Sequence, residues 1–82
     1  MQSIRVGQVY DEIEIGNFFG RWKVLSFENG KWKCEAFDRV GRIRNGTIHS
    51  FEEYVFSAHW MQLNKEYNVR QVLNKIDKNE NK

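Results

Sequence analysis

The chain has 82 residues, of which 40% are hydrophobic and 15% aromatic, and its formal net charge is +2. A chain of this length buries only about 60% of its unfolded surface, so we expect one domain with one modest core and no large cleft. The single cysteine excludes an internal disulfide. The lack of a long apolar run or a signal-like N-terminus predicts a soluble, cytoplasmic protein that does not contact the membrane.

The first 20 residues predict one strand and an acidic loop. Residues 4–10 alternate between apolar and polar side chains, which is typical of a strand. Residues 11–17 contain three acids, and we expect them to form a loop. Two interpretations of this loop stay open: an ordinary solvated loop, or a contact in which residues 11–14 imitate phosphates toward a basic protein groove.

A β-hairpin is the strongest local signal in the chain. The dipeptide Asn29-Gly30 lies between two alternating runs and predicts a two-residue turn. Counting outward from this turn places Leu25 opposite Cys34 and Trp22 opposite Phe37. The predicted core face consists of Leu25, Phe27, Trp32, Cys34 and Ala36. The predicted outer face consists of Trp22, Val24, Ser26, Lys33, Glu35 and Phe37.

The sequence after the hairpin predicts a second turn and another strand. Residues 38–41 suit a tight turn with Gly41 at positive φ, and residues 42–49 suit a strand. In this register Ile48 lies on the core face opposite Trp32, whereas Ile43 enlarges the apolar cluster of the outer face.

The C-terminal third predicts two helical segments around a short strand. Ser50 and Glu53 have the spacing of a capping box, so a helical turn is expected there, followed by a strand at residues 60–63. Either Asn64 or Asn68 caps a terminal helix, which docks on the domain, frays or binds a partner. Its apolar stripe consists of Val69, Val72, Leu73 and Ile76. We therefore divide the chain into a β domain (residues 1–63), a helix (64–77) and a polar tail (78–82).

Positive charge is concentrated in the middle of the chain. Seven of the 13 lysines and arginines lie between residues 21 and 50, together with only three acids. These cations are Arg21, Lys23, Lys31, Lys33, Arg39, Arg42 and Arg44. They either solvate an outer sheet face or form an electrostatic footprint for phosphates or an acidic protein surface.

Signals for catalysis or cofactor binding are sparse. His49 and His59 lie ten residues apart without a second cysteine, which is not the spacing of a zinc site. The chain has no glycine-rich phosphate loop, and Cys34 lies on the predicted core face, where a thiol is inert. We therefore expect no metal, no cofactor and no enzymatic activity.

Most of the chain resembles the short Src-homology-3-like barrel proteins of bacterial phages and mobile elements. This resemblance covers about three quarters of the chain and implies a small β-barrel. It is carried by Val6-Gly7-Gln8-Val9-Tyr10, Arg21-Trp22-Lys23-Val24-Leu25, the Asn29-Gly30 turn, Gly41-Arg42 and residues 51–63.

A second set of motifs resembles the β-rich DNA-binding segment found with phage homing endonucleases. These motifs are Ile15-Gly16, Phe19-Gly20-Arg21, Val24-Leu25 and Trp32-Lys33-Cys34. The family pattern continues into paired cysteines, which Glu35-Ala36-Phe37 replace here. Both resemblances imply an accessory protein of a phage or mobile element.

Together these features predict a mainly β fold with a short C-terminal helix, either a small Src-homology-3-like barrel or a strongly twisted antiparallel sheet. The first functional hypothesis is a non-enzymatic module that binds nucleic acid, DNA or RNA, through a basic aromatic sheet face. The expected phosphate contacts are Arg21, Lys23, Lys33, Arg39, Arg42 and Arg44, and the expected stacking rings are Trp22 and Phe37. The alternative is an inhibitor or adaptor that blocks a host protein, for example in a bacterial defence or nucleic-acid-processing complex, and uses the same patch as a hot spot. The oligomeric state stays open, and so does whether Trp22 is exposed or covered by the C-terminal helix.

Overall fold

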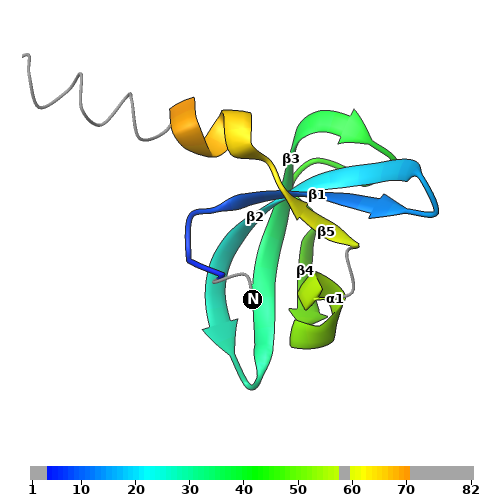
Figure 1. The fold of residues 1–82 in the computed structure, drawn as a ribbon. Helices are drawn as coiled ribbons and strands as arrows, with labels where there is room; N and C mark the ends of the chain where they lie inside the picture. Colours follow the sequence, from blue (N-terminus) through cyan, green and yellow to red (C-terminus); the bar gives the residue numbers. More distant parts are fainter. Residues whose placement is uncertain (1–3, 58–59, 71–82) are drawn as a thin grey trace, which may run out of the picture.

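A computed structural model describes residues 4–57 and 60–70 and shows five antiparallel strands in one sheet (Figure 1). The order across the sheet is β4-β3-β2-β1-β5, so the three longest pairings join neighbours in sequence and β5 returns to the far side of β1. The elements are β1 (Val9–Glu14), β2 (Asn17–Glu28), β3 (Lys31–Gly41), β4 (Ile48–Glu52), α1 (Glu53–Ser57) and β5 (Met61–Leu63). The predicted mainly β fold is confirmed.

The acidic segment belongs to a strand. Residues 11–14 continue β1 and pair with β2, so the loop predicted there is wrong. The two strands are joined by a tight turn at Ile15 and Gly16, both with positive φ. Two of its acids have partners on β2: Asp11 pairs with Arg21, and Glu12 accepts a hydrogen bond from Trp22.

A β-bulge at Leu25 changes the register of the central hairpin. The Asn29-Gly30 turn forms as predicted, with Glu28 opposite Lys31. Beyond Ser26, however, Leu25 has no counterpart, so Val24 lies opposite Cys34. A one-residue slip moves every later side chain to the other face, and the predicted outer-face positions of Trp22 and Val24 are therefore wrong.

The bulge reconciles two apolar patterns that are out of phase. On β2 the apolar positions change parity between Val24 and Phe27, whereas on β3 the positions Trp32 and Cys34 keep a constant period of two. A ladder without a bulge would place either the Val24 set or the Phe27 set of β2 on the outer face of the sheet. The extra residue lets both sets lie on the inner face of the sheet.

The connection from β3 to β4 also differs from the prediction. Strand β3 continues to Gly41, whose φ of 83° confirms the predicted positive value, and a loop of residues 42–47 precedes β4. As a result Trp32 lies opposite Phe51, so the predicted pairing with Ile48 is wrong. The side chain of Ile43 packs against the core instead of joining an outer cluster.

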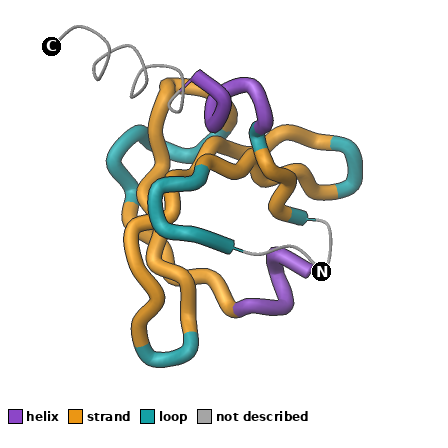
Figure 2. Tube along the Cα trace, turned by 60° about the vertical axis from the view of Figure 1, so that its left-hand side comes forward, coloured by secondary structure: helices purple, strands orange, loops and turns teal. Residues whose placement is uncertain are grey.

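The two helical segments lie at opposite ends of the sheet (Figures 1 and 2). The helical turn α1 and the strand β5 occur where they were expected, although the predicted cap Ser50 lies within β4. Residues 65–70 are helical, and Asn64 caps them because its Oδ1 accepts the N–H of Tyr67 at 2.9 Å. Of the predicted stripe, Val69 is exposed, and the other three residues lie outside the described residues.

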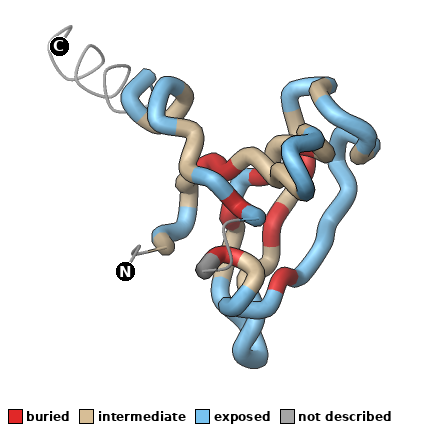
Figure 3. Tube along the Cα trace, turned by 45° about the vertical axis from the view of Figure 1, so that its right-hand side comes forward, coloured by how far each residue is buried: buried red, intermediate tan, exposed pale blue. Residues whose placement is uncertain are grey.

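The core is built mainly from the inner faces of β1, β2 and β3, together with one side chain each from β4, α1 and β5. It consists of Tyr10, Trp22, Val24, Cys34, Ala36, Phe51, Phe56 and Met61. Figure 3 shows the buried positions in the middle of the molecule and the exposed ones at the hairpin turns. The predicted burial of Cys34 and Ala36 is confirmed, whereas Phe27 and Ile48 are each 48% exposed.

Candidate nucleic-acid interface

The structure separates the predicted contact residues into four places. Trp22 lies in the core, Arg21 and Phe37 lie near the terminal helix, Lys23 and Lys33 lie on the outer face of the sheet, and three arginines lie around the β3–β4 loop. The patch expected from the sequence is therefore not one continuous surface made by all eight residues.

Trp22 is a core residue and is not available to stack on a base. Its side chain is 3% exposed, and its ring packs edge-on against Phe51 of β4 with 4.9 Å between the centroids. The indole Nε1–H donates a hydrogen bond of 3.0 Å to Oε1 of Glu12 on β1. The ring is thus held by its packing against β4 and by a carboxylate on the neighbouring strand.

Glu12 belongs to the acidic segment that the sequence offered as a contact for a basic protein, but its partial burial and its pairing with Glu14 were not predicted. The pKa of its carboxyl is raised to about 7, mainly by burial and also by a hydrogen bond shared with Glu14, while the hydrogen bond from Trp22 acts in the opposite direction. The two acids lie two residues apart on one strand, so they share a face. The alternation of Glu12 and Glu14 could have revealed this pair if residues 11–14 had been assigned to a strand.

Arg21 is neutralised by two acids. Its Nε donates to Asp11 Oδ1 at 2.8 Å, and its Nη1 donates to Asp38 Oδ2. The hydrogen bond to Asp11 is the main cause that raises the pKa of Arg21. Asp11 also accepts a hydrogen bond of 3.1 Å from Nδ2 of Asn64, so this ion pair connects the sheet to the start of the terminal helix.

Phe37 packs against the terminal helix. Its ring is half-buried and meets the ring of Tyr67 edge-on, with 5.1 Å between the centroids. This contact uses part of the surface that we expected to stack on nucleic acid. Phe37 therefore helps to hold the helix on the sheet.

The outer face of the sheet is balanced in charge. Lys23 lies opposite Glu35 in the β2–β3 ladder, and Lys31 lies opposite Glu52 in the β3–β4 ladder. Cross-strand pairs of opposite charge stabilise a sheet and leave little net potential on that face. The predicted role of Lys23 in a strongly basic face thus gains no support from its surroundings.

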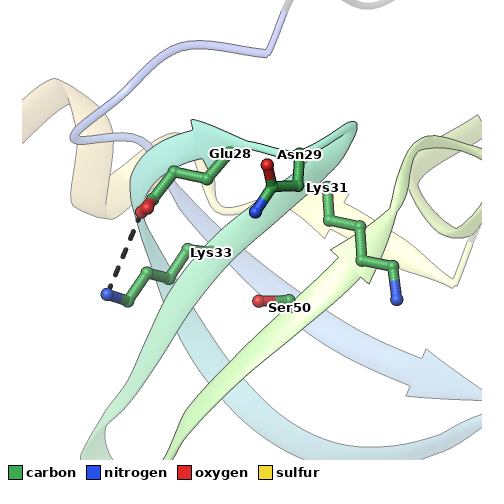
Figure 4. A pocket seen from close by; sticks show the side chains of 5 residues that line it. All are labelled: Glu28, Asn29, Lys31, Lys33 and Ser50. Atoms are coloured by element: carbon green, nitrogen blue, oxygen red, sulfur yellow. Dashed lines mark ion pairs between the residues drawn. The ribbon is translucent and has the colours of Figure 1, made fainter.

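An open pocket on this face has the same mixed character. It is lined by Glu28, Asn29, Lys31, Lys33 and Ser50, and its volume is about 420 Å³ (Figure 4). Lys33 Nζ lies 3.9 Å from Glu28 Oε2, whereas the side chain of Lys31 points the other way. The two ammonium groups do not converge on one point, which an anion site requires.

Three exposed arginines remain, and we call them the arginine connection: Arg39, Arg42 and Arg44. They lie within six residues at the end of β3 and in the loop that follows. Among residues 4–57 and 60–70, none of the three forms an ion pair. The guanidinium of Arg42 lies over the ring of Phe19, 5.1 Å from its centroid, which is within the range of a cation–π contact.

The backbone of the arginine connection is fixed to β2. The N–H groups of Arg42 and Ile43 both donate to the carbonyl oxygen of Phe19. Gly41 makes this approach possible, because a Cβ at that position would clash with the backbone of Phe19 and Gly20. The arginines therefore project from an anchored segment.

The described part of the chain contains no group of three histidine, cysteine or acidic side chains that could hold a metal ion, and no helix within it is long and apolar enough to cross a membrane. Burial raises the pKa of the Cys34 thiol to about 12, so this thiol stays protonated and unreactive at neutral pH.

Comparisons with known proteins assign no family to the chain. No protein-family model matches it, and no curated protein or solved structure matches it significantly. The case for a function therefore rests on the arrangement of the residues described above.

Proposed function

We propose that this protein is a non-enzymatic module that binds nucleic acid through the arginine connection. One observation carries the proposal: Arg39, Arg42 and Arg44 are exposed and have no carboxylate partner in the described residues, whereas Arg21 and Lys33 are paired with acids. Unpaired arginines are available to phosphate oxygens, and the planar guanidinium suits bidentate contacts to phosphate.

The geometry adds pre-organisation to this positive charge. Because the carbonyl of Phe19 holds two backbone N–H groups of the loop, the arginines lose less freedom on binding than they would on a free loop. The Phe19 ring supports one face of the Arg42 guanidinium. Contacts of this kind fix the position of a protein on the phosphate backbone and carry no base specificity.

The number of arginines sets how strongly the affinity for nucleic acid should depend on salt concentration. Three phosphate contacts predict that the logarithm of the association constant falls with the logarithm of salt concentration with a slope of about −3 on duplex DNA. Such a protein binds weakly at physiological salt and without strong sequence preference. Its affinity for single strands has a somewhat smaller slope for the same number of contacts.

Fluorescence anisotropy with labelled duplex DNA, single-stranded DNA and RNA tests this proposal across a salt series. Changing Arg42 and Arg44 to Ala should flatten the slope by about two, because each lost contact removes about one unit. The matched control changes Lys23 and Lys33 to Ala on the charge-balanced face and should leave the slope unchanged. The proposed interface is wrong if the arginine variant has the same salt slope as the wild type, or if the lysine variant has a flatter one.

The resemblance to phage and mobile-element proteins gives this proposal a setting. In that setting the protein acts in the bacterial cytoplasm as an accessory factor on nucleic acid.

Inhibition of a host protein is the competing function, and it has a distinct experimental signature. A 1:1 complex with a protein that survives nuclease and moderate salt, together with no retention of DNA or RNA, would replace the nucleic-acid proposal.

A further inference from the structure

Two turns with the same backbone are filled by different residues. The β2–β3 turn has Asn29 and Gly30 at φ of 52° and 75°, and the β1–β2 turn has Ile15 and Gly16 at 49° and 75°. Asparagine tolerates the left-handed region and is preferred in such turns. Isoleucine is β-branched, so the same backbone is strained at Ile15.

Burial within the domain does not compensate for this strain. Ile15 is 98% exposed, the highest exposure of any large hydrophobic side chain in the described residues. Its turn projects from the sheet at the right of Figure 1. Contacts within the domain therefore do not offset the strain at Ile15, and backbone outliers of this kind cluster at functional sites.

The charge around the turn indicates the chemistry of the partner. Glu14 precedes Ile15, and Glu12 lies on the same face of β1. In the described part of the chain, neither acid forms an ion pair with a lysine or arginine. Because the carboxyl of Glu12 is hydrogen-bonded to the buried Trp22, the negative charge beside the apolar tip comes from Glu14.

We propose that Ile15 is an anchor that inserts into an apolar pocket of another protein whose rim carries lysines or arginines. A nucleic acid does not fit this tip, because the carboxylate of Glu14 would face phosphates. A bilayer does not fit either, since one aliphatic side chain buries too little area to hold a protein on a membrane, and anionic lipids would repel the acids. The anchor does not depend on the proposed function, although Phe19, which contacts Arg42, lies on the same hairpin.

The two turns of the protein supply a sharp test. Ile15→Asn gives the β1–β2 turn the residues that the β2–β3 turn already has, so relief of strain should raise Tm by about 4–8 °C. The same change should weaken binding to the partner at least about tenfold, because it removes the anchor. Ile15→Val should retain most of the affinity. The matched control Val6→Asn alters another exposed aliphatic residue and should not change the affinity.

The partner is identified with a benzophenone amino acid placed at position 15, and at position 6 as control, in cells that naturally contain the protein. A protein that cross-links from position 15 and not from position 6 is purified, and its Kd is measured by calorimetry with the four forms of the domain. Opposite changes in Tm and affinity for Ile15→Asn support the anchor, since a structural residue would lower both.

The proposal is overturned by any of four results. These are no cross-link at position 15 above the control, a cross-link only to a second copy of the chain or to lipid, unchanged affinity of Ile15→Asn for the captured protein, and a fall in Tm for Ile15→Asn. The salt series on nucleic acid is independent of each of these, so failure of the anchor leaves the arginine connection to its own test.

Discussion

At the scale of single residues, the main gap between sequence and structure is the position of Trp22. Its alternation with Val24 was visible in the sequence, but the face depended on a count from the turn, and one bulged residue, Leu25, reversed that count. The local rule at Asn29-Gly30 held because turn chemistry acts over two residues. The bulge depends on packing across the whole sheet, and counting residues outward from the turn gives no information on that packing.

The buried carboxyl of Glu12 makes stability depend on pH. Its pKa is about 7 in the folded protein and 4.5 ordinarily, so the folded state binds the proton more tightly. The stability that this group contributes is therefore present below about pH 4.5, falls as the pH rises toward 7 and stays low above it. We expect Glu12→Gln to be more stable than the wild type at pH 8 and to show a weaker loss of stability between pH 5 and pH 8.

Thermal unfolding at several pH values measures this effect. The amide oxygen of glutamine can still accept the hydrogen bond from Trp22, so the substitution removes the ionisation and keeps the contact. Glu52→Gln, on the exposed end of β4, is the control and should follow the wild-type profile. If Glu12→Gln and the wild type have parallel profiles, the carboxyl does not carry this pH dependence.

At the scale of elements, the sequence predicted the existence of strands better than their ends. Strand β3 was expected to stop before Asp38, yet it continues to Gly41 with Asp38 and Arg39 in left-handed conformations. The ion pair from Asp38 to Arg21 lies in this irregular stretch. Such a stretch is held by contacts with β2 that lie far apart in sequence, and propensity does not report them.

Two glycines of the β3–β4 region separate the cost of backbone conformation from the cost of a clash. Gly41 and Gly46 have similar positive φ values of 83° and 87°, but a Cβ at Gly41 would meet the backbone of Phe19, whereas nothing lies within 4 Å at Gly46. Gly46→Ala should cost about 1–2 kcal/mol of unfolding free energy for the left-handed backbone alone. Gly41→Ala should cost clearly more.

Urea denaturation of the two variants measures both costs on the same scale. The nucleic-acid affinity should follow the same order, because a displaced Gly41 releases the arginine connection from β2. Equal losses of stability in the two variants would show that the loop can move away from Phe19 without penalty, and the anchored arrangement would then be incorrect.

At the scale of the whole molecule, the sequence predicted a basic centre, and the structure shows where that charge remains available. Arg21 is paired with acids, and Lys23 and Lys31 on the outer face lie opposite acids in the ladder, so the arginine connection is left as a cluster of exposed arginines without an ion pair among the described residues. Net charge and charge runs are readable from sequence. Which cations lie beside acids depends on the register, and a shift of one residue changes that answer.

The attachment of the terminal helix to the sheet yields the last prediction. Asn68 Oδ1 accepts the N–H of Val9 at 3.0 Å, and its Nδ2 donates to the carbonyl of this fully buried residue at 3.2 Å. The same carbonyl also accepts the backbone N–H of Asn64 at 3.0 Å, so the N–H of Val9 is the group that depends on Asn68. Asn68→Ala leaves the buried N–H of Val9 without this partner and should cost about 1–3 kcal/mol of unfolding free energy, whereas the carbonyl of Val9 keeps its bond from the N–H of Asn64. Arg70→Ala is the control on the same helix, because it breaks only the exposed ion pair with Glu66, which is worth about 0.3–0.5 kcal/mol. Chemical denaturation compares the two, and a loss for Asn68→Ala as small as that for Arg70→Ala would mean that the sheet does not depend on the helix for its stability.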